Sequence, residues 1–350
     1  MQGIVYGLTA AVLFGASTPL AKWLLGNGLD PWLLAGLLYG GAGIGLSVVY
    51  LLRGHHAAEA SLQRRDLPWL ALVVLFGGIA GPVLLMYGLA HTSAASASLL
   101  LNLEGLATMT IAWLVFHEHV DRRLMLGALA ILCGATLLSY HGADGFGIGT
   151  LAIAAACLAW GIDNNLTRKL SGSDPLQIAA TKGIVAGCAN ITLAMAHGTH
   201  WPGSVSVVEA AVIGFCGYGI SVVAFVLALR HLGTARTGAY FSTAPFIGAA
   251  LSVLLLNDSV SVSLLIATAL MGIGVYLHLT EKHEHEHDHE ALEHEHRHAH
   301  DAHHQHLHTS DDPPDEPHSH RHQHVPLIHK HRHYPDLHHR HGHPPTPESC

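Results

Sequence analysis

Residues 90–138 read AHTSAASASLLLNLEGLATMTIAWLVFHEHVDRRLMLGALAILCGATLL, in which two long apolar runs flank the charged segment HEHVDRR (117–123). We place these runs at 96–116 and 123–140. Each is close to roughly 20 residues, the length that an α-helix rising about 1.5 Å per residue needs to cross a hydrocarbon core of about 30 Å. The stretch therefore predicts two consecutive transmembrane helices.

Apolar runs of similar length recur on both sides of this stretch and stop near Thr280. The chain has 350 residues, of which 50% are hydrophobic and 12% charged, a composition that argues against a soluble globular fold. We predict an all-α polytopic membrane protein, embedded in the lipid bilayer, with ten transmembrane helices. The predicted spans are 4–25, 32–52, 69–89, 96–116, 123–140, 148–168, 177–197, 207–229, 238–256 and 260–279.

Basic residues are distributed unevenly among the connections between these helices. The odd-numbered connections carry only Lys22, at the edge of the first span. Because cytoplasmic loops hold an excess of Lys and Arg, we predict that both termini lie in the cytoplasm, in a bacterial-type inner membrane. The even-numbered connections carry Arg53, Arg64, Arg65, Arg122, Arg123, Arg168, Lys169, Arg230 and Arg236.

The last part of the chain, 281–350, differs in composition from the rest. It holds 23 of the 33 histidines, with 14 acidic and 6 basic residues, and so accounts for the net charge of −8. With few apolar residues it is predicted to be disordered, and its dense imidazoles suit zinc, nickel, cobalt or copper. A spacer or an expression tag is the alternative. The predicted metal ligands are His283, His285, His287, His289, His294, His296, His298, His300, His303, His304, His306 and His308. We expect no required cofactor and no nucleic-acid partner.

An internal repeat appears when the chain is shifted by 140 residues. GLAHTSAASAS (88–98) then lies over ALRHLGTARTG (228–238), and acidic Glu118 over acidic Asp258. Because each half has five predicted spans, an odd number, the two halves must insert with opposite orientation. The pattern predicts the inverted repeat that supports alternating access in secondary transporters.

The stretch 90–138 resembles the signature of the fourth and fifth helices of the EamA-like transporters, in the drug/metabolite transporter superfamily. The second copy, GTARTGAYFSTAPFIGAALSVLLLNDSVSVSLLIATALMGIGVYL (233–277), keeps the typical Pro245, whereas the first has Gly105 instead, beside Glu104. The resemblance covers 1–280 and implies two five-helix repeats, 1–140 and 147–280, that transport a small solute.

Glu104 is the leading candidate for a substrate or coupling site, since an ionisable side chain within a span is costly and usually faces the bundle interior. Asn102 lies two residues before it. Together they offer oxygen ligands or a protonatable carboxyl group. The alternative is a carboxyl group that serves only helix packing.

A second set of polar residues lies in the sixth and seventh spans. Asp163 and Asn164 precede Asn165, and Lys182 follows in the next span. Asp163 and Lys182 are predicted either to contact substrate or to form a structural salt bridge, because buried charges are seldom left unpaired. Asn190 adds a polar group at the membrane midplane, where asparagine more often links helices.

Three functions remain open on this basis, none of them enzymatic. The first is a secondary carrier of a transition-metal cation, loaded or regulated by the tail. The second is a carrier of an organic metabolite or amino acid, whose tail only buffers metal. The third is a metal receptor without transport. The substrate, the direction of transport and the oligomeric state, a homodimer included, are not determined by the sequence.

Overall fold

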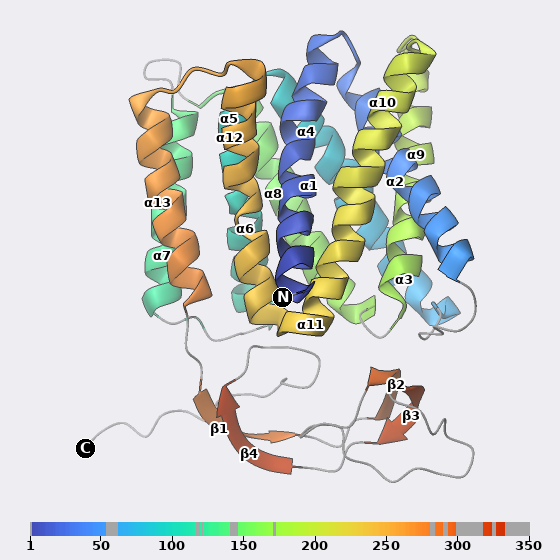
Figure 1. Ribbon diagram of the computed structural model, residues 1–350, viewed down its shortest axis with the longest axis vertical. Helices are drawn as coiled ribbons and strands as arrows, with labels where there is room; N and C mark the ends of the chain where they lie inside the picture. The colour runs from blue at the N-terminus through green and yellow to red at the C-terminus, as the bar shows by residue number, and fades with distance from the viewer. Residues whose placement is uncertain are drawn as a thin grey trace.

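A computed structural model describes residues 2–53, 62–116, 120, 122–140, 146–170, 173–280 and four short segments of the tail. Up to Thr280 these residues form a bundle of helices (Figure 1). In chain order the helical elements are α1 (Gln2–Gly26), α2 (Pro31–Arg53), η2 (Arg64–Asp66), α3 (Leu67–Val73), η3 (Val74–Ala80), α4 (Gly81–Ala90), α5 (Ala94–Leu100), α6 (Asn102–Phe116), α7 (Arg122–Ser139), α8 (Ile148–Thr167), η5 (Arg168–Leu170), α9 (Pro175–Ala196), α10 (Ser204–Gly214), η6 (Phe215–Ile220), α11 (Ser221–Phe241), α12 (Ala244–Leu256) and α13 (Val262–Leu279).

Within the described residues, 9 helical stretches are long and apolar enough to cross a membrane. They confirm a polytopic membrane protein. Helix α8 has 20 residues and is as long as several of the nine, yet it is not among them, because its last turns carry Asp163, Asn164 and Asn165. A tenth span therefore stays a prediction, and α8 is the helix on which it depends.

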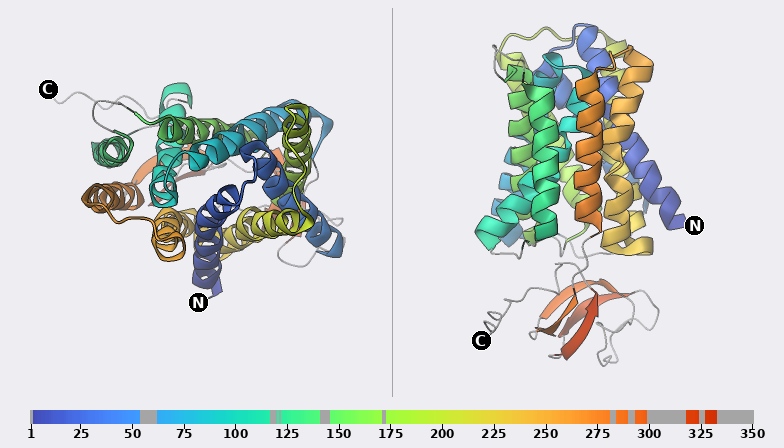
Figure 2. Two further views of the ribbon diagram at one scale, coloured as in Figure 1. Left: turned by 90° about the horizontal axis from the view of Figure 1, so that it is seen from above. Right: turned by 90° about the vertical axis from the view of Figure 1, so that its left-hand side faces the viewer.

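The helices pack in a pattern that links distant parts of the chain. Helix α2 lies against α9, and α7 against α13, as the right-hand view of Figure 2 shows for the second pair. Helix α1 packs against α11 and α12, whereas α8 packs against α4 and α6. The backbones of α2 and α9 approach closely because Gly40 faces Gly187 and Gly43 faces Gly183, and a Cβ at Gly43, Gly183 or Gly187 would collide with the facing backbone.

Two π-helical segments, η3 and η6, interrupt the spans in which they lie. A π turn leaves carbonyl groups outside the regular helical pattern, and side chains of neighbouring helices use them in η3. The Gly77 carbonyl accepts hydrogen bonds from the Tyr39 hydroxyl (2.9 Å) and the Trp160 indole (3.1 Å). The Gly78 carbonyl accepts one from the Asn190 amide (2.9 Å). These hydrogen bonds hold α2, α8 and α9 against η3.

The predicted loop between 229 and 238 is wrong, because α11 continues as a helix to Phe241. The chain turns instead at Ser242 and Thr243, immediately before Pro245 near the start of α12. Pro245, the second residue of α12, has no backbone N–H and cannot donate to the Phe241 carbonyl four residues before it, so the helix cannot continue through this point.

The disorder predicted for residues 281–350 stays a prediction, because the structure describes only part of the tail. This described part pairs in short strands. It forms β1 (Glu284–His289), β2 (Glu293–His298), β3 (His318–Gln323) and β4 (Leu327–Arg332), with β1 antiparallel to β4 and β2 antiparallel to β3. The alternation of histidine with other residues has the period of a strand. The register sets three acidic residues opposite basic ones: Glu284 opposite Arg332, Glu286 opposite Lys330 and Glu295 opposite Arg321. Six predicted ligands lie in β1 and β2, whereas His283, His300, His303, His304, His306 and His308 lie outside the described residues.

Candidate functional site

Helix α8 turns its polar end toward the interior of the bundle. Its exposed apolar residues Leu151, Ala155 and Leu158 follow one stripe, as expected for a surface that faces lipid. Asn164 is also exposed, but it lies nine residues beyond Ala155, about two and a half turns, and therefore on the face opposite the middle of this stripe. The exposed surface of Asn164 thus borders an opening between helices.

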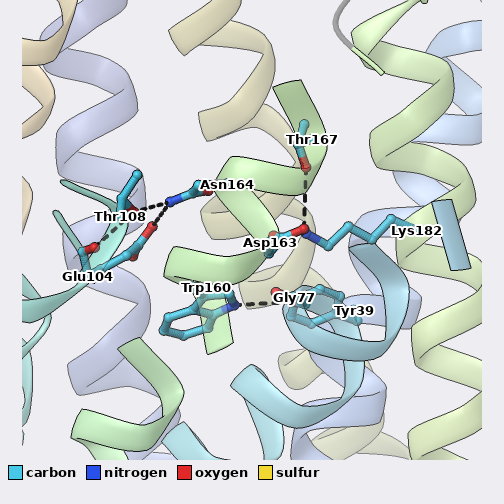
Figure 3. Close-up of polar contacts among 9 residues, drawn as sticks. All are labelled: Tyr39, Gly77, Glu104, Thr108, Trp160, Asp163, Asn164, Thr167 and Lys182. Carbon is cyan, nitrogen blue, oxygen red and sulfur yellow. Dashed lines mark hydrogen bonds and ion pairs between the residues drawn. The ribbon is translucent and has the colours of Figure 1, made fainter. Parts of the chain in front are cut away.

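Glu104 on α6 meets Asn164 at this opening. The Asn164 amide nitrogen donates to the Glu104 carboxyl oxygen Oε1 (3.0 Å) and to the Thr108 hydroxyl (3.1 Å), as Figure 3 shows. Glu104 is partly buried. Gly105 beside it is exposed, and a Cβ there would meet no atom within 4 Å. We refer to Glu104, Thr108 and Asn164 as the Glu104 site.

Asp163 points away from the Glu104 site, toward α9, where it pairs with Lys182 (Figure 3). The side chains are only 6% and 18% exposed, respectively. The Thr167 hydroxyl also donates to the Asp163 carboxylate (3.3 Å). The ion pair fits because Gly77 in η3 has no side chain, since a Cβ there would collide with both charged groups.

The other predicted site residues are engaged elsewhere. The Asn102 amide donates to the Leu99 carbonyl (2.8 Å) and contacts the Met271 sulfur (3.9 Å), so this side chain is turned toward α13. Asn190 is fully buried and binds η3 through Gly78. Both hold helices together, and the structure brings only Asn164 to Glu104.

Aromatic residues that the sequence did not single out lie close to these polar groups. The ring centroids of Tyr39 and Tyr218 are 5.5 Å apart, and those of Phe14 and Tyr218 are 5.9 Å apart. Tyr39 and Trp160 donate to the same Gly77 carbonyl, and Trp160 lies one helical turn before Asn164 on α8. The one signal in the sequence was the glycine-rich surroundings of Tyr218, which are typical of close helix packing and not specific for a site.

At the end of the bundle away from the N-terminus, a second set of contacts joins distant segments. The Lys22 ammonium group donates to the carbonyls of Leu89 (2.6 Å) and Thr92 (2.9 Å), at the end of α4. The Asp258 carboxylate accepts from the Ala95 backbone N–H (2.8 Å), at the start of α5. These contacts join the end of α1 and the segment after α12 to the turn between α4 and α5.

Comparison with known proteins identifies the family. The model of the EamA-like transporter family matches residues 1–140 and again 147–280. The chain belongs to the EamA-like transporter family. The resemblance predicted from 90–138 is confirmed, and membership in a family of transporters agrees with the prediction that the protein is not an enzyme.

Two individual proteins are similar to this EamA-like transporter, one in sequence and one in fold. An uncharacterized transporter of Methanothermobacter thermautotrophicus is 26% identical over 280 residues, which are 75% of this chain and 81% of that protein. A solved crystal structure with 23% sequence identity has a TM-score of 0.57 and covers 79% of this chain and 96% of its own. At that identity the second similarity concerns the fold alone.

Gly77→Ala is expected to destabilise this EamA-like transporter by about 1–3 kcal/mol, the usual cost of overpacking a full interior. The added methyl group would displace the ion pair of Asp163 and Lys182. Thermal unfolding in detergent measures the effect. Gly238→Ala in α11, where a Cβ meets nothing within 4 Å, is the matched control and is expected to melt like the parent protein. Equal melting of the two variants would contradict the packing described here.

Proposed function

We propose that the protein is a secondary active carrier of a small solute and that the Glu104 site binds the solute or the coupling ion. The observation that carries this proposal is the meeting of Glu104 and Thr108, from the first matched segment, with Asn164, from the second. A partly exposed carboxyl group between two halves of a membrane protein is placed where a transported solute passes in carriers built from repeats.

Alternating access would follow from two inverted five-helix repeats. The packing supports this arrangement, because α1 lies on α11 and α12 as α8 lies on α4 and α6. A π segment also occurs in the third predicted span of each half, as η3 and η6. In this proposal the contacts of Lys22 and Asp258 close one side, which would be the external side if both termini are cytoplasmic. They would separate when that side opens.

The tail would link the carrier to transition metals from the cytoplasmic side of an inner membrane. Its histidines would bind zinc, nickel, cobalt or copper and thereby buffer the metal or regulate transport. In the spans that the structure describes, no group of three or more His, Cys, Asp or Glu residues could hold a metal ion. This favours an organic solute as the cargo and a regulatory role for the tail metal. Transport of the metal ion itself stays the rival proposal.

Flux into liposomes separates these proposals. The purified full-length protein would be tested with zinc, nickel and cobalt ions and with amino acids and other small metabolites, each under an imposed proton gradient. Glu104→Gln, made in the same preparation, tests the site. Saturable flux of at least one solute, lost in the variant, supports the proposal. A protein that binds metal but transports none of these compounds would instead be a receptor.

Truncation after Thr280 is expected to leave a folded carrier whose flux no longer depends on zinc. The helices up to Thr280 satisfy their backbone hydrogen bonds internally, and the buried hydrophobic residues of the described part all lie between Ala10 and Met271. The isolated tail is expected to bind several zinc ions at neutral pH and to release them below about pH 6, because protons and metal compete for the imidazole nitrogens. Flux into liposomes at different zinc concentrations measures the first expectation, and titration of the isolated tail with zinc at several pH values measures the second. An identical zinc response in the full-length and truncated proteins would refute the link.

A further inference from the structure

The free hydrogen-bonding groups of the Glu104 site are all acceptors. The amide nitrogen of Asn164 has two N–H groups, and its two bonds go to Glu104 and Thr108. The Thr108 hydroxyl donates its hydrogen to the Glu104 backbone carbonyl (2.9 Å). The side-chain donors are therefore used. What remains is the second carboxyl oxygen of Glu104 and the amide oxygen of Asn164, neither of which is bonded within the described residues.

The charge of the site also favours a ligand with a positively charged donor group. Among the described residues Glu104 has no ion-pair partner, and Lys182 in α9 is already paired with Asp163. An ionised Glu104 therefore attracts a cation from the opening. A carboxylate ligand would meet a like charge and no free side-chain donor, which costs affinity.

Aromatic rings connected to α8 through the Gly77 carbonyl, which Tyr39 shares with Trp160, suit an organic cation. Tyr39 is fixed by its bond to the Gly77 carbonyl, and its ring leans on that of Tyr218, which in turn contacts Phe14. Ring faces attract an ammonium group and pack against the apolar part of the molecule that carries it. A transition metal would need imidazole or thiolate ligands, and magnesium or calcium needs about six oxygens, whereas this site has one carboxyl and one amide oxygen free.

We propose that the solute carried by this protein is a small organic ammonium compound with an apolar body. Its ammonium N–H groups bind the free oxygens of Glu104 and Asn164, and its apolar part lies against Tyr39 and Tyr218. This inference rests on the proposed function and adds the chemical class of the solute.

Three compounds with the same ring and different head groups test the proposal: 2-phenylethylamine, 2-phenylethanol and phenylacetate. Binding to the full-length protein is measured by calorimetry, and uptake into liposomes with radiolabelled compound. We expect the amine to bind at least about ten-fold more tightly than the other two, as a site of unpaired acceptors requires. Glu104→Gln should remove this preference, whereas Glu209→Gln in α10 should keep it.

The outcomes distinguish the inferred chemical class of the solute from the proposed transport function. Binding of the alcohol or the acid as tight as that of the amine overturns the inference, and so does failure of the amine and of hexylamine to bind. If another solute is transported and its flux is lost in Glu104→Gln, the proposed function stands without the ammonium class. If Glu104→Gln does not fold, as judged by melting, Glu104→Asp keeps the charge and should keep the preference for the amine.

Discussion

Lys182→Met is expected to lower the free energy of unfolding by about 3–5 kcal/mol, the cost of leaving a buried charge without its partner. Asp163 is 6% exposed, so water cannot replace the lost ammonium group. The Thr167 hydroxyl offers one weaker bond at 3.3 Å and does not neutralise the charge. Chemical unfolding in detergent, followed by tryptophan fluorescence, measures the change.

The double variant with Asp163→Asn and Lys182→Met provides the control. It removes both charges and should recover most of the lost stability, since neutral groups are cheaper to bury than one unpaired ion. Lys169→Met is a second control, because that side chain is exposed and lies 6.0 Å from the ring centre of Trp69. A change of less than about 1 kcal/mol is expected there. Parent-like stability of Lys182→Met would show that the ion pair is not what holds α8 to α9.

Glu104→Gln is expected to reduce transport about ten- to hundred-fold or more while membrane expression stays normal. A hydrogen bond to a charged group is worth about 1.5–3 kcal/mol, and each 1.4 kcal/mol corresponds to a factor of ten. Glutamine keeps the volume of the side chain and loses its charge, and its own N–H groups would occupy the place of a ligand donor. Initial rates of uptake into liposomes measure the loss.

Two further variants show whether the effect belongs to the site. Asp163→Asn should reduce transport less, because Asp163 faces α9 and not the opening. Glu209→Gln in α10 should leave the rate unchanged. If Glu104→Gln transports at the parent rate, Glu104 serves packing and the site assignment is wrong.

The sequence predicted the membrane helices well, because their determinants are local. A run of apolar residues of sufficient length specifies a span regardless of what packs against it, and the resemblance of 90–138 led directly to the family. Glu104 was recognised for the same reason, since a charge within an apolar run stands out. Its partner Asn164 was named as a candidate but could not be joined to it, because the pairing depends on how α6 and α8 pack.

What the sequence did not reveal depends on contacts between helices. The π segment η3 is set by hydrogen bonds from Tyr39, Trp160 and Asn190, which come from three different helices. Gly77 looked like any other small residue, although it makes room for the ion pair. Helix α11 continues through the loop predicted between 229 and 238 because this segment contains no proline. The helix ends only shortly before Pro245 of α12.

The central claim is that Glu104 lies on the path of the transported solute, and carbodiimide labelling tests it most directly. The reagent modifies carboxyl groups in apolar surroundings, and mass spectrometry locates the adduct in the full-length protein in liposomes. We expect Glu104 to be labelled and a transported solute to slow that labelling in proportion to its occupancy, while the labelling of Glu209 stays constant. Labelling of Glu104 that is unaffected by a saturating concentration of a transported solute would contradict the account.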